Sequence, residues 1–103
     1  MKRAARRKAT LATLRLAAEC TLREAEALKL ALLAAEDSSG DFVIDAGAVT
    51  RVDTAGLQLL IGFANRLELT GRRLVWRDVP AALRVTALQG GLDALLRLPA
   101  VPA

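Results

Sequence analysis

The chain has 103 residues, of which 53% are hydrophobic and 25% are charged, so its composition is that of one folded domain with one small core. It contains no histidine, one cysteine, two phenylalanines and one tryptophan. These counts exclude histidine-dependent catalysis, histidine metal ligands and an internal disulfide, and they leave too few rings for a stacking surface that binds RNA.

The net charge of +4 is concentrated at the start of the chain. Five of the 15 basic residues lie in this short segment, namely Lys2, Arg3, Arg6, Arg7 and Lys8. The rest of the chain has 10 basic and 11 acidic residues, so it carries a net charge of −1. We therefore predict a basic flexible leader over residues 1–9, and we do not expect the domain itself to bind nucleic acid.

No apolar run is long enough to span a membrane. Arg15 and Glu19 interrupt the run that follows the basic leader, which argues against a signal peptide. The lone Cys20 fits a reducing compartment, and we expect it to be a small buried side chain and not a nucleophile. The sequence thus favours a cytoplasmic protein without a membrane span.

The first half of the chain predicts a strand, a helix and a second strand. Residues 11–18 alternate between apolar and polar side chains, as a strand does. A capping box, Thr21-Leu22-Arg23-Glu24, opens a helix that is expected to run to about Ala35. Residues 41–46 are apolar without alternation, which predicts a strand covered on both faces. The buried stripe of the helix is expected to contain Leu22, Ala25, Leu28, Leu32 and Leu33.

The second half begins with a loop or short turn over residues 47–53. A second helix is expected from about Ala55 to Leu69, and Gly71 is its expected C-terminal cap. Its buried face is expected to contain Leu57, Leu60, Ile61, Phe63, Ala64 and Leu67.

The last part of the chain predicts a third strand over residues 74–77. A third helix is expected to start at Pro80 and to end at Gly90-Gly91. Residues 92–98 are expected to add a short helix or strand, and residues 99–103 a tail.

The alternation of strands and helices predicts an α/β fold with a mixed, mainly parallel β-sheet. Too few elements are present to cover both faces of this sheet, so the helices are expected on one side or mostly on one side.

Asp53 and Thr54 are the candidate functional residues, because they place a carboxylate and a hydroxyl at a helix N-terminus. Either residue could cap the helix, or the Thr54 hydroxyl could face a partner or carry a phosphate held by the same backbone donors. Asp41 and Asp45 are expected to serve turns, and two such acids do not make a general acid–base pair without a pocket. We therefore expect no enzyme, no metal site and no cofactor.

The run Arg51-Val52-Asp53-Thr54-Ala55-Gly56-Leu57-Gln58-Leu59-Leu60 resembles the signature segment of the STAS family, the sulphate-transporter and anti-sigma-factor-antagonist domains. Similarity extends over about residues 11–98 and includes Thr21-Leu22-Arg23-Glu24-Ala25, Phe42-Val43-Ile44-Asp45 and Gly71-Arg72-Arg73-Leu74. The resemblance implies a STAS domain over residues 10–98 with a sheet backed by helices, which acts through protein contacts without catalysis.

In the antagonist branch of this family, a kinase phosphorylates the hydroxyl after the signature aspartate, and this releases a bound regulator. The resemblance makes Thr54 the phosphoacceptor or switch residue, with Asp53, Ala55 and Gly56 as its supporting loop. Asp53 would assist the local geometry, and Gly56 would allow a partner to approach closely. Ala55 stands where a second serine is common in that branch.

The resemblance leaves several partners open. The main expectation is an anti-sigma-factor-antagonist-like or chemosensory switch that binds a kinase-like anti-sigma factor or a chemosensory protein. The alternative is a STAS subunit, similar to MlaB, that binds the ATPase of a lipid-trafficking ABC transporter and uses Thr54 as a contact residue.

The exposed side of the second helix is the expected partner-binding face, because it carries few charges. This face contains Gln58, Leu59, Gly62 and Asn65. Exposed apolar side chains, such as Leu59 or Leu69, also leave a homodimer possible, whereas Trp76 is expected to pack from its strand against a helix.

Overall fold

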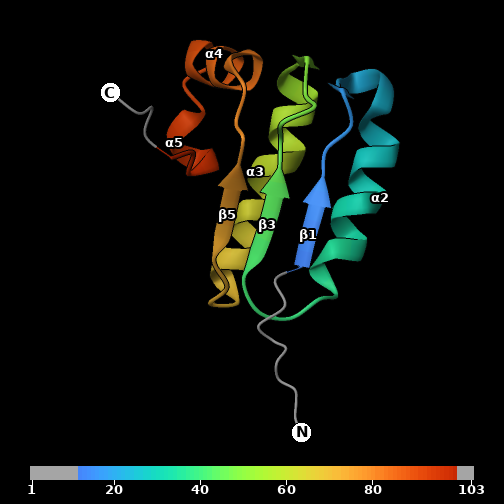
Figure 1. Ribbon diagram of the computed structural model, residues 1–103, viewed down its shortest axis with the longest axis vertical. Helices are drawn as coiled ribbons and strands as arrows, with labels where there is room; N and C mark the ends of the chain where they lie inside the picture. The colour runs from blue at the N-terminus through green and yellow to red at the C-terminus, as the bar shows by residue number, and fades with distance from the viewer. Residues whose placement is uncertain (1–11, 100–103) are drawn as a thin grey trace, which may run out of the picture.

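The computed structural model describes residues 12–99, and three parallel strands lie at its centre (Figure 1). The strand order in this sheet is β1-β3-β5, and the register places Leu14 beside Ile44 and Ile44 beside Trp76. The strands are β1 (Ala12–Arg15), β3 (Phe42–Asp45) and β5 (Leu74–Arg77). The predicted leader lies outside the described residues, as do residues 100–103 of the predicted tail.

A second, very small sheet was not predicted. It pairs β2 (Glu19–Cys20) with β4 (Arg51–Val52), again in parallel. Residues 51–52 were expected to be loop, because a strand of two residues is too short to show an alternating pattern. Every strand pair within residues 12–99 is parallel, so the mainly parallel α/β sheet is confirmed.

Helix α3 covers one face of the central sheet, and the other helices lie at its margins and above its end (Figure 1). In that view α3 runs behind the strands, α2 lies beyond β1, α5 lies beside β5, and α4 sits above the carboxyl end of β5. This arrangement agrees with the prediction of helices mostly on one side. The helical segments are η1 (Leu22–Glu24), α2 (Ala25–Glu36), α3 (Thr54–Leu69), α4 (Ala81–Gln89) and α5 (Asp93–Leu96). None of them is long and apolar enough to cross a membrane.

The core lies between the helices and the sheet. Phe42 of β3 and Phe63 of α3 meet edge to face, with ring centroids 5.4 Å apart. Trp76 of β5 is buried, and its indole N–H donates to the carbonyl oxygen of Leu96 at 2.8 Å. Trp76 therefore packs from its strand against a helix, as predicted.

Two leucines that were predicted to be buried beside α2 are exposed. Leu22 is 71% exposed and Leu33 is 45% exposed. The capping box opens the 3₁₀ turn η1, whose three residues per turn take Leu22 out of the α-helical stripe. Leu33 is turned by about 100° from Leu32, which is buried, so it lies at the margin of the stripe.

The C-terminal end of α3 has the predicted glycine cap. Gly71 has φ of 76°, a value that L side chains rarely adopt. Its N–H donates to the carbonyl oxygen of Glu68 at 2.9 Å, and the N–H of Arg72 donates to that of Leu67 at 2.9 Å. These two bonds form a Schellman motif, which ends the helix and starts the turn into β5.

Candidate partner-binding site at the start of helix α3

Asp53 is the residue that caps α3. Its carboxylate accepts two backbone N–H groups, from Gly56 at 3.1 Å and from Leu22 at 2.9 Å. The N–H of Leu22 and then that of Gly56 lower the pKa of Asp53, because both bonds favour the ionised carboxylate. The first bond caps the helix, and the second ties the start of α3 to η1.

Thr54 is the first residue of α3, and its side chain is exposed. Asp53 supplies the capping oxygen, so the Thr54 hydroxyl is not needed for the cap. It lies in the first helical turn, where unpaired backbone N–H groups point outward. Thr54 is therefore placed where a partner can contact it.

Gly56 is buried and faces the chain itself, which corrects the expectation that it admits a partner. A Cβ atom at this position would stand 2.0 Å from the carbonyl oxygen of Cys20 in β2. The same carbonyl oxygen accepts the N–H of Asp53 at 3.3 Å. Glycine is required at position 56 because α3 crosses the backbone of β2 there. The neighbouring Ala55 is half-buried.

Cys20 is a buried core residue, as predicted, and is 2% exposed. Burial raises the pKa of its thiol, and the nearby Glu24 carboxylate adds to this effect. Glu24 itself accepts the Thr21 hydroxyl at 2.6 Å, a bond that lowers the pKa of Glu24. The thiol therefore has little thiolate character and is a structural side chain.

The predicted binding face of α3 divides into two parts. Gln58 and Asn65 are exposed and share a helical stripe with Thr54. Leu59 and Gly62 are half-buried and lie farther around the helix. The exposed stripe thus presents hydroxyl and amide groups without a charge among these three residues.

Gly62 is covered by an ion pair between two helices. The Arg66 guanidinium lies 3.2 Å from the place that a Cβ atom of Gly62 would take. Arg66 Nε in turn donates to Glu36 of α2 at 2.7 Å. Gly62 therefore lies where α3 contacts α2 and is not an open position for a partner.

A shallow groove adjoins Asp53 and was not predicted. It runs between η1, β4 and α4, and Leu22, Val52 and Val85 contribute its apolar surface. Leu22 is 71% exposed and Val85 is 50% exposed. These residues are far apart in the sequence, and only the packing of α4 near β4 brings them together.

The chemistry of this region suits binding. Its exposed groups are a hydroxyl, amides and apolar side chains, together with the charged side chains of Glu19, Arg23 and Arg51 along the groove. The carboxylate of Asp53 is occupied by backbone N–H groups. Within residues 12–99 no group of three or more His, Cys, Asp or Glu residues could hold a metal ion.

The sequence matches the family described as "Mlab, STAS domain" over residues 4–98. This match covers most of the chain, so the chain belongs to that family, and the predicted STAS resemblance is confirmed. The match begins inside the segment that was predicted to be the leader. The family is not a catalytic one.

The fold is similar to that in a crystal structure of a sulfate transporter family protein from Wolinella succinogenes. The TM-score is 0.69 at 21% sequence identity, over 84% of this chain and 70% of that chain. At this identity the likeness shows the fold alone: a small α/β domain with a parallel sheet backed by helices. No curated protein matches the sequence.

Proposed function

We propose that this chain is a non-enzymatic STAS subunit that binds the ATPase of an ABC transporter in the cytoplasm. The observation that carries the proposal is an exposed Thr54 at the start of α3, in a chain that belongs to the Mlab family. Transporter-associated STAS domains carry an Asp-Thr pair at this place, and there the threonine acts by contact. This proposal replaces the switch as the leading function, and the switch becomes the second candidate.

The exposed stripe of α3 has the composition of an interface. Thr54, Gln58 and Asn65 are uncharged, and charged residues are depleted at the centre of protein interfaces because their desolvation is costly. The groove beside Asp53 adds the apolar surface of Leu22 and Val85. A partner that covers both would bury apolar and polar groups together, as stable interfaces do.

A phosphoswitch at Thr54 remains the second candidate, because the hydroxyl is exposed and Asp53 makes the cap. A phosphate would add about −1.5 to −2 charges at the positive end of α3. The helix would favour this charge and Asp53 would oppose it. A partner packed over Thr54 would be displaced.

The test is capture of partners from the native host by the full chain, with identification by mass spectrometry. The variants are Thr54→Ala, Thr54→Glu and Gln58→Arg, and the control is Gln89→Arg, the same change at an exposed position on α4. We expect an ABC ATPase with the wild type and Gln89→Arg, and its loss with Gln58→Arg and Thr54→Glu.

Other outcomes decide between the candidates. A kinase-like or anti-sigma partner that Thr54→Ala retains and Thr54→Glu loses would establish the switch and reject the transporter subunit. If all variants still capture an ABC ATPase, the contact with this ATPase lies outside the exposed stripe of α3.

A further inference from the structure

The groove beside Asp53 has two apolar walls that are open to solvent. Leu22 of η1 lines one side and Val85 of α4 lines the other, and these side chains are 71% and 50% exposed. Val52 of β4 also lines the groove and is half-buried. Because burial of apolar surface is favourable, an apolar side chain that enters between Leu22 and Val85 would stabilise a complex.

The side of the groove that α4 forms carries no charge. It is lined by Ala81, Ala82, Val85 and Thr86. The single charged residue of α4 is Arg84, which donates to the carbonyl oxygen of Pro99 at 2.7 Å and does not line the groove. A partner therefore meets only apolar and hydroxyl groups on this side.

Four charged side chains line the rest of the groove, and three of them already have partners. Asp53 accepts two backbone N–H groups, and Glu19 pairs with Arg51 at 3.8 Å. Arg23 is exposed and has no ion-pair partner within residues 12–99. The neighbouring Glu24 closes the capping box instead. Arg23 is therefore the charged group of the groove that is left for a partner.

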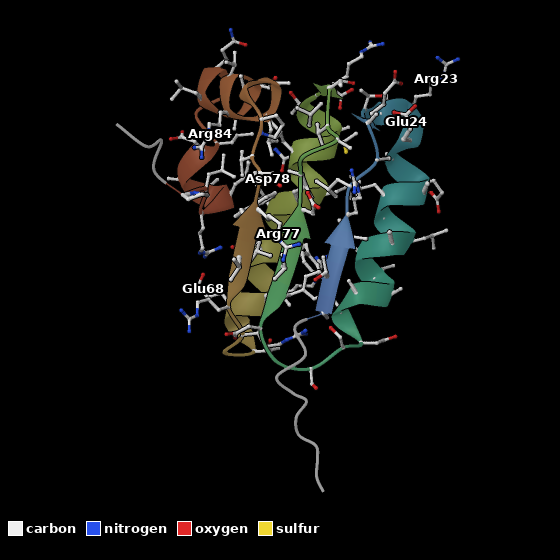
Figure 2. The ribbon with its side chains drawn as sticks, in the orientation of Figure 1. Arg23, Glu24, Glu68, Arg77, Asp78 and Arg84 are labelled. Carbon is white, nitrogen blue, oxygen red and sulfur yellow. The ribbon has the colours of Figure 1, made fainter. Side chains whose placement is uncertain are left out.

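Arg23 reaches away from the domain at the start of α2, as Figure 2 shows. The start of α3, which carries Thr54, lies at the same end of the domain in Figure 1. A partner that covers Thr54 and the groove from this end also meets Arg23. Its planar guanidinium can donate two parallel hydrogen bonds to one carboxylate, and arginine is among the residue types that contribute most to binding at interfaces.

We propose that the ATPase inserts an apolar side chain between Leu22 and Val85 and sets a carboxylate against Arg23. This inference rests on the proposed function and adds the chemistry that the partner must present. An ATPase with a basic side chain opposite Arg23 would be repelled, so this contact selects among related partners.

The two contacts should act on different rate constants. Arg23 lies at the rim, where a charge attracts its partner through water and is screened by salt. The contact of Val85 forms only in the finished complex, after water has left the groove. A change at Arg23 should therefore act mainly on association, and a change at Val85 mainly on dissociation.

The first test is the binding kinetics of the full chain with the ABC ATPase that the wild type captures, at low and at high salt. Arg23→Glu should lower the association rate constant by about tenfold at low salt, and the difference should shrink as salt is added. Lys29→Glu is the matched control, because it makes the same change in net charge on the exposed side of α2. It should bind like the wild type, and equal rates for the two variants would overturn the role of Arg23.

The second test places a carboxylate in the apolar part of the groove. Val85→Asp should raise the dissociation rate constant by about tenfold or more, because the complex would bury an unpaired charge. Leu88→Asp is the matched control, because Leu88 is 67% exposed on the same helix and lies outside the groove. Circular dichroism checks that both variants are folded, and equal dissociation rates for the two would overturn the apolar contact.

The outcomes separate this inference from the proposed function. A wild type that captures no ABC ATPase would reject both. Binding that Gln58→Arg weakens, while Arg23→Glu and Val85→Asp bind like the wild type, would leave the proposed function in place and overturn this inference.

Discussion

At the scale of single residues, the start of α3 assigns different tasks to three neighbours. Asp53 caps the helix and binds η1, Gly56 packs on the backbone of Cys20, and Thr54 is left to face outward. The signature segment is therefore largely a structural device that holds one exposed hydroxyl in place.

Gly56 and Gly62 lie in the same helix, yet alanine should have opposite effects at the two positions. Gly56→Ala brings a Cβ atom to 2.0 Å from a backbone oxygen, so we expect a loss of about 1–3 kcal/mol in the free energy of unfolding. Gly62→Ala meets only the flexible end of Arg66 and should be neutral or stabilising by about 0.5–1 kcal/mol. Urea unfolding of both variants measures the difference, and equal stabilities would contradict the packing of α3 on β2.

The stability of the folded chain should depend on pH through the carboxyl groups of Asp53 and Glu24. Both carboxyls have a lower pKa in the folded chain, so the unfolded chain binds more protons around their ordinary pKa. Their contribution is present above that pKa and is lost as the pH falls through the folded value. Thermal unfolding from about pH 5 to about pH 3 should therefore fall less steeply for Asp53→Asn than for the wild type. Glu26→Gln, a change on the exposed side of α2, is the control and should follow the wild type.

At the scale of elements, one arginine joins the two turns at the lower edge of the sheet. Arg72, just after α3, donates to the carbonyl oxygens of Gly40 at 2.7 Å and Glu36 at 3.2 Å and to the Ser38 hydroxyl at 2.9 Å. It thereby holds the connection from α2 to β3 against the connection from α3 to β5.

Removing this link should loosen the connection between α2 and β3. Arg72→Met keeps the length of the stem and loses all three bonds, so we expect a loss of about 1–3 kcal/mol in the free energy of unfolding. Arg73→Met is the control, because Arg73 forms an exposed ion pair with Asp41 at 3.7 Å, which contributes less than about 1 kcal/mol. Denaturant unfolding compares them, and similar losses would show that Arg72 has no special role.

The sequence predicted the long elements well and the short ones poorly. β5 has the bounds predicted for the third strand. Helix α3 begins within one residue of its predicted start and ends at Leu69 as predicted, because apolar periodicity indicates the helix and Gly71 marks its end. β2 and β4 have two residues each and depend on each other's backbone, so no local pattern reveals them. Periodicity also misplaced Leu22, since it assumes a full α-helix where the chain makes a 3₁₀ turn.

The candidate site was predictable where it is local. Asp53 and Thr54 are neighbours in the sequence, and the expectation that one of them caps the helix is confirmed by Asp53. Gly56 received the wrong role, because its contact with Cys20 depends on the undetected strand β2. The groove with Val85 depends on where α4 packs, and no spacing in the sequence indicates that.

At the scale of the whole molecule, helices close both margins of the central sheet, with α2 beyond β1 and α5 beside β5 (Figure 1). α5 does this beside β5, where Leu96 is fully buried and its carbonyl oxygen accepts the Trp76 indole N–H. This bond joins the last helix to the sheet, across 20 residues of chain.

Trp76→Phe should release α5 more than it unfolds the domain. The change leaves the buried Leu96 carbonyl without its donor and opens space, which should cost about 1–3 kcal/mol. Hydrogen exchange should rise more in residues 93–98 than in β3. Val75→Ala in the same strand is the control, because Val75 is 41% exposed. Unchanged exchange in α5 would show that the bond does not hold it.

The most direct measurement of the central claim is the dissociation constant between the purified chain and the ABC ATPase that it captures. Because a charge placed in the centre of an interface is costly, Gln58→Arg should weaken binding by about tenfold or more. Gln89→Arg on α4 should bind like the wild type. Equal dissociation constants for all three proteins, or no binding by the wild type, would contradict the account that the exposed stripe of α3 binds this ATPase.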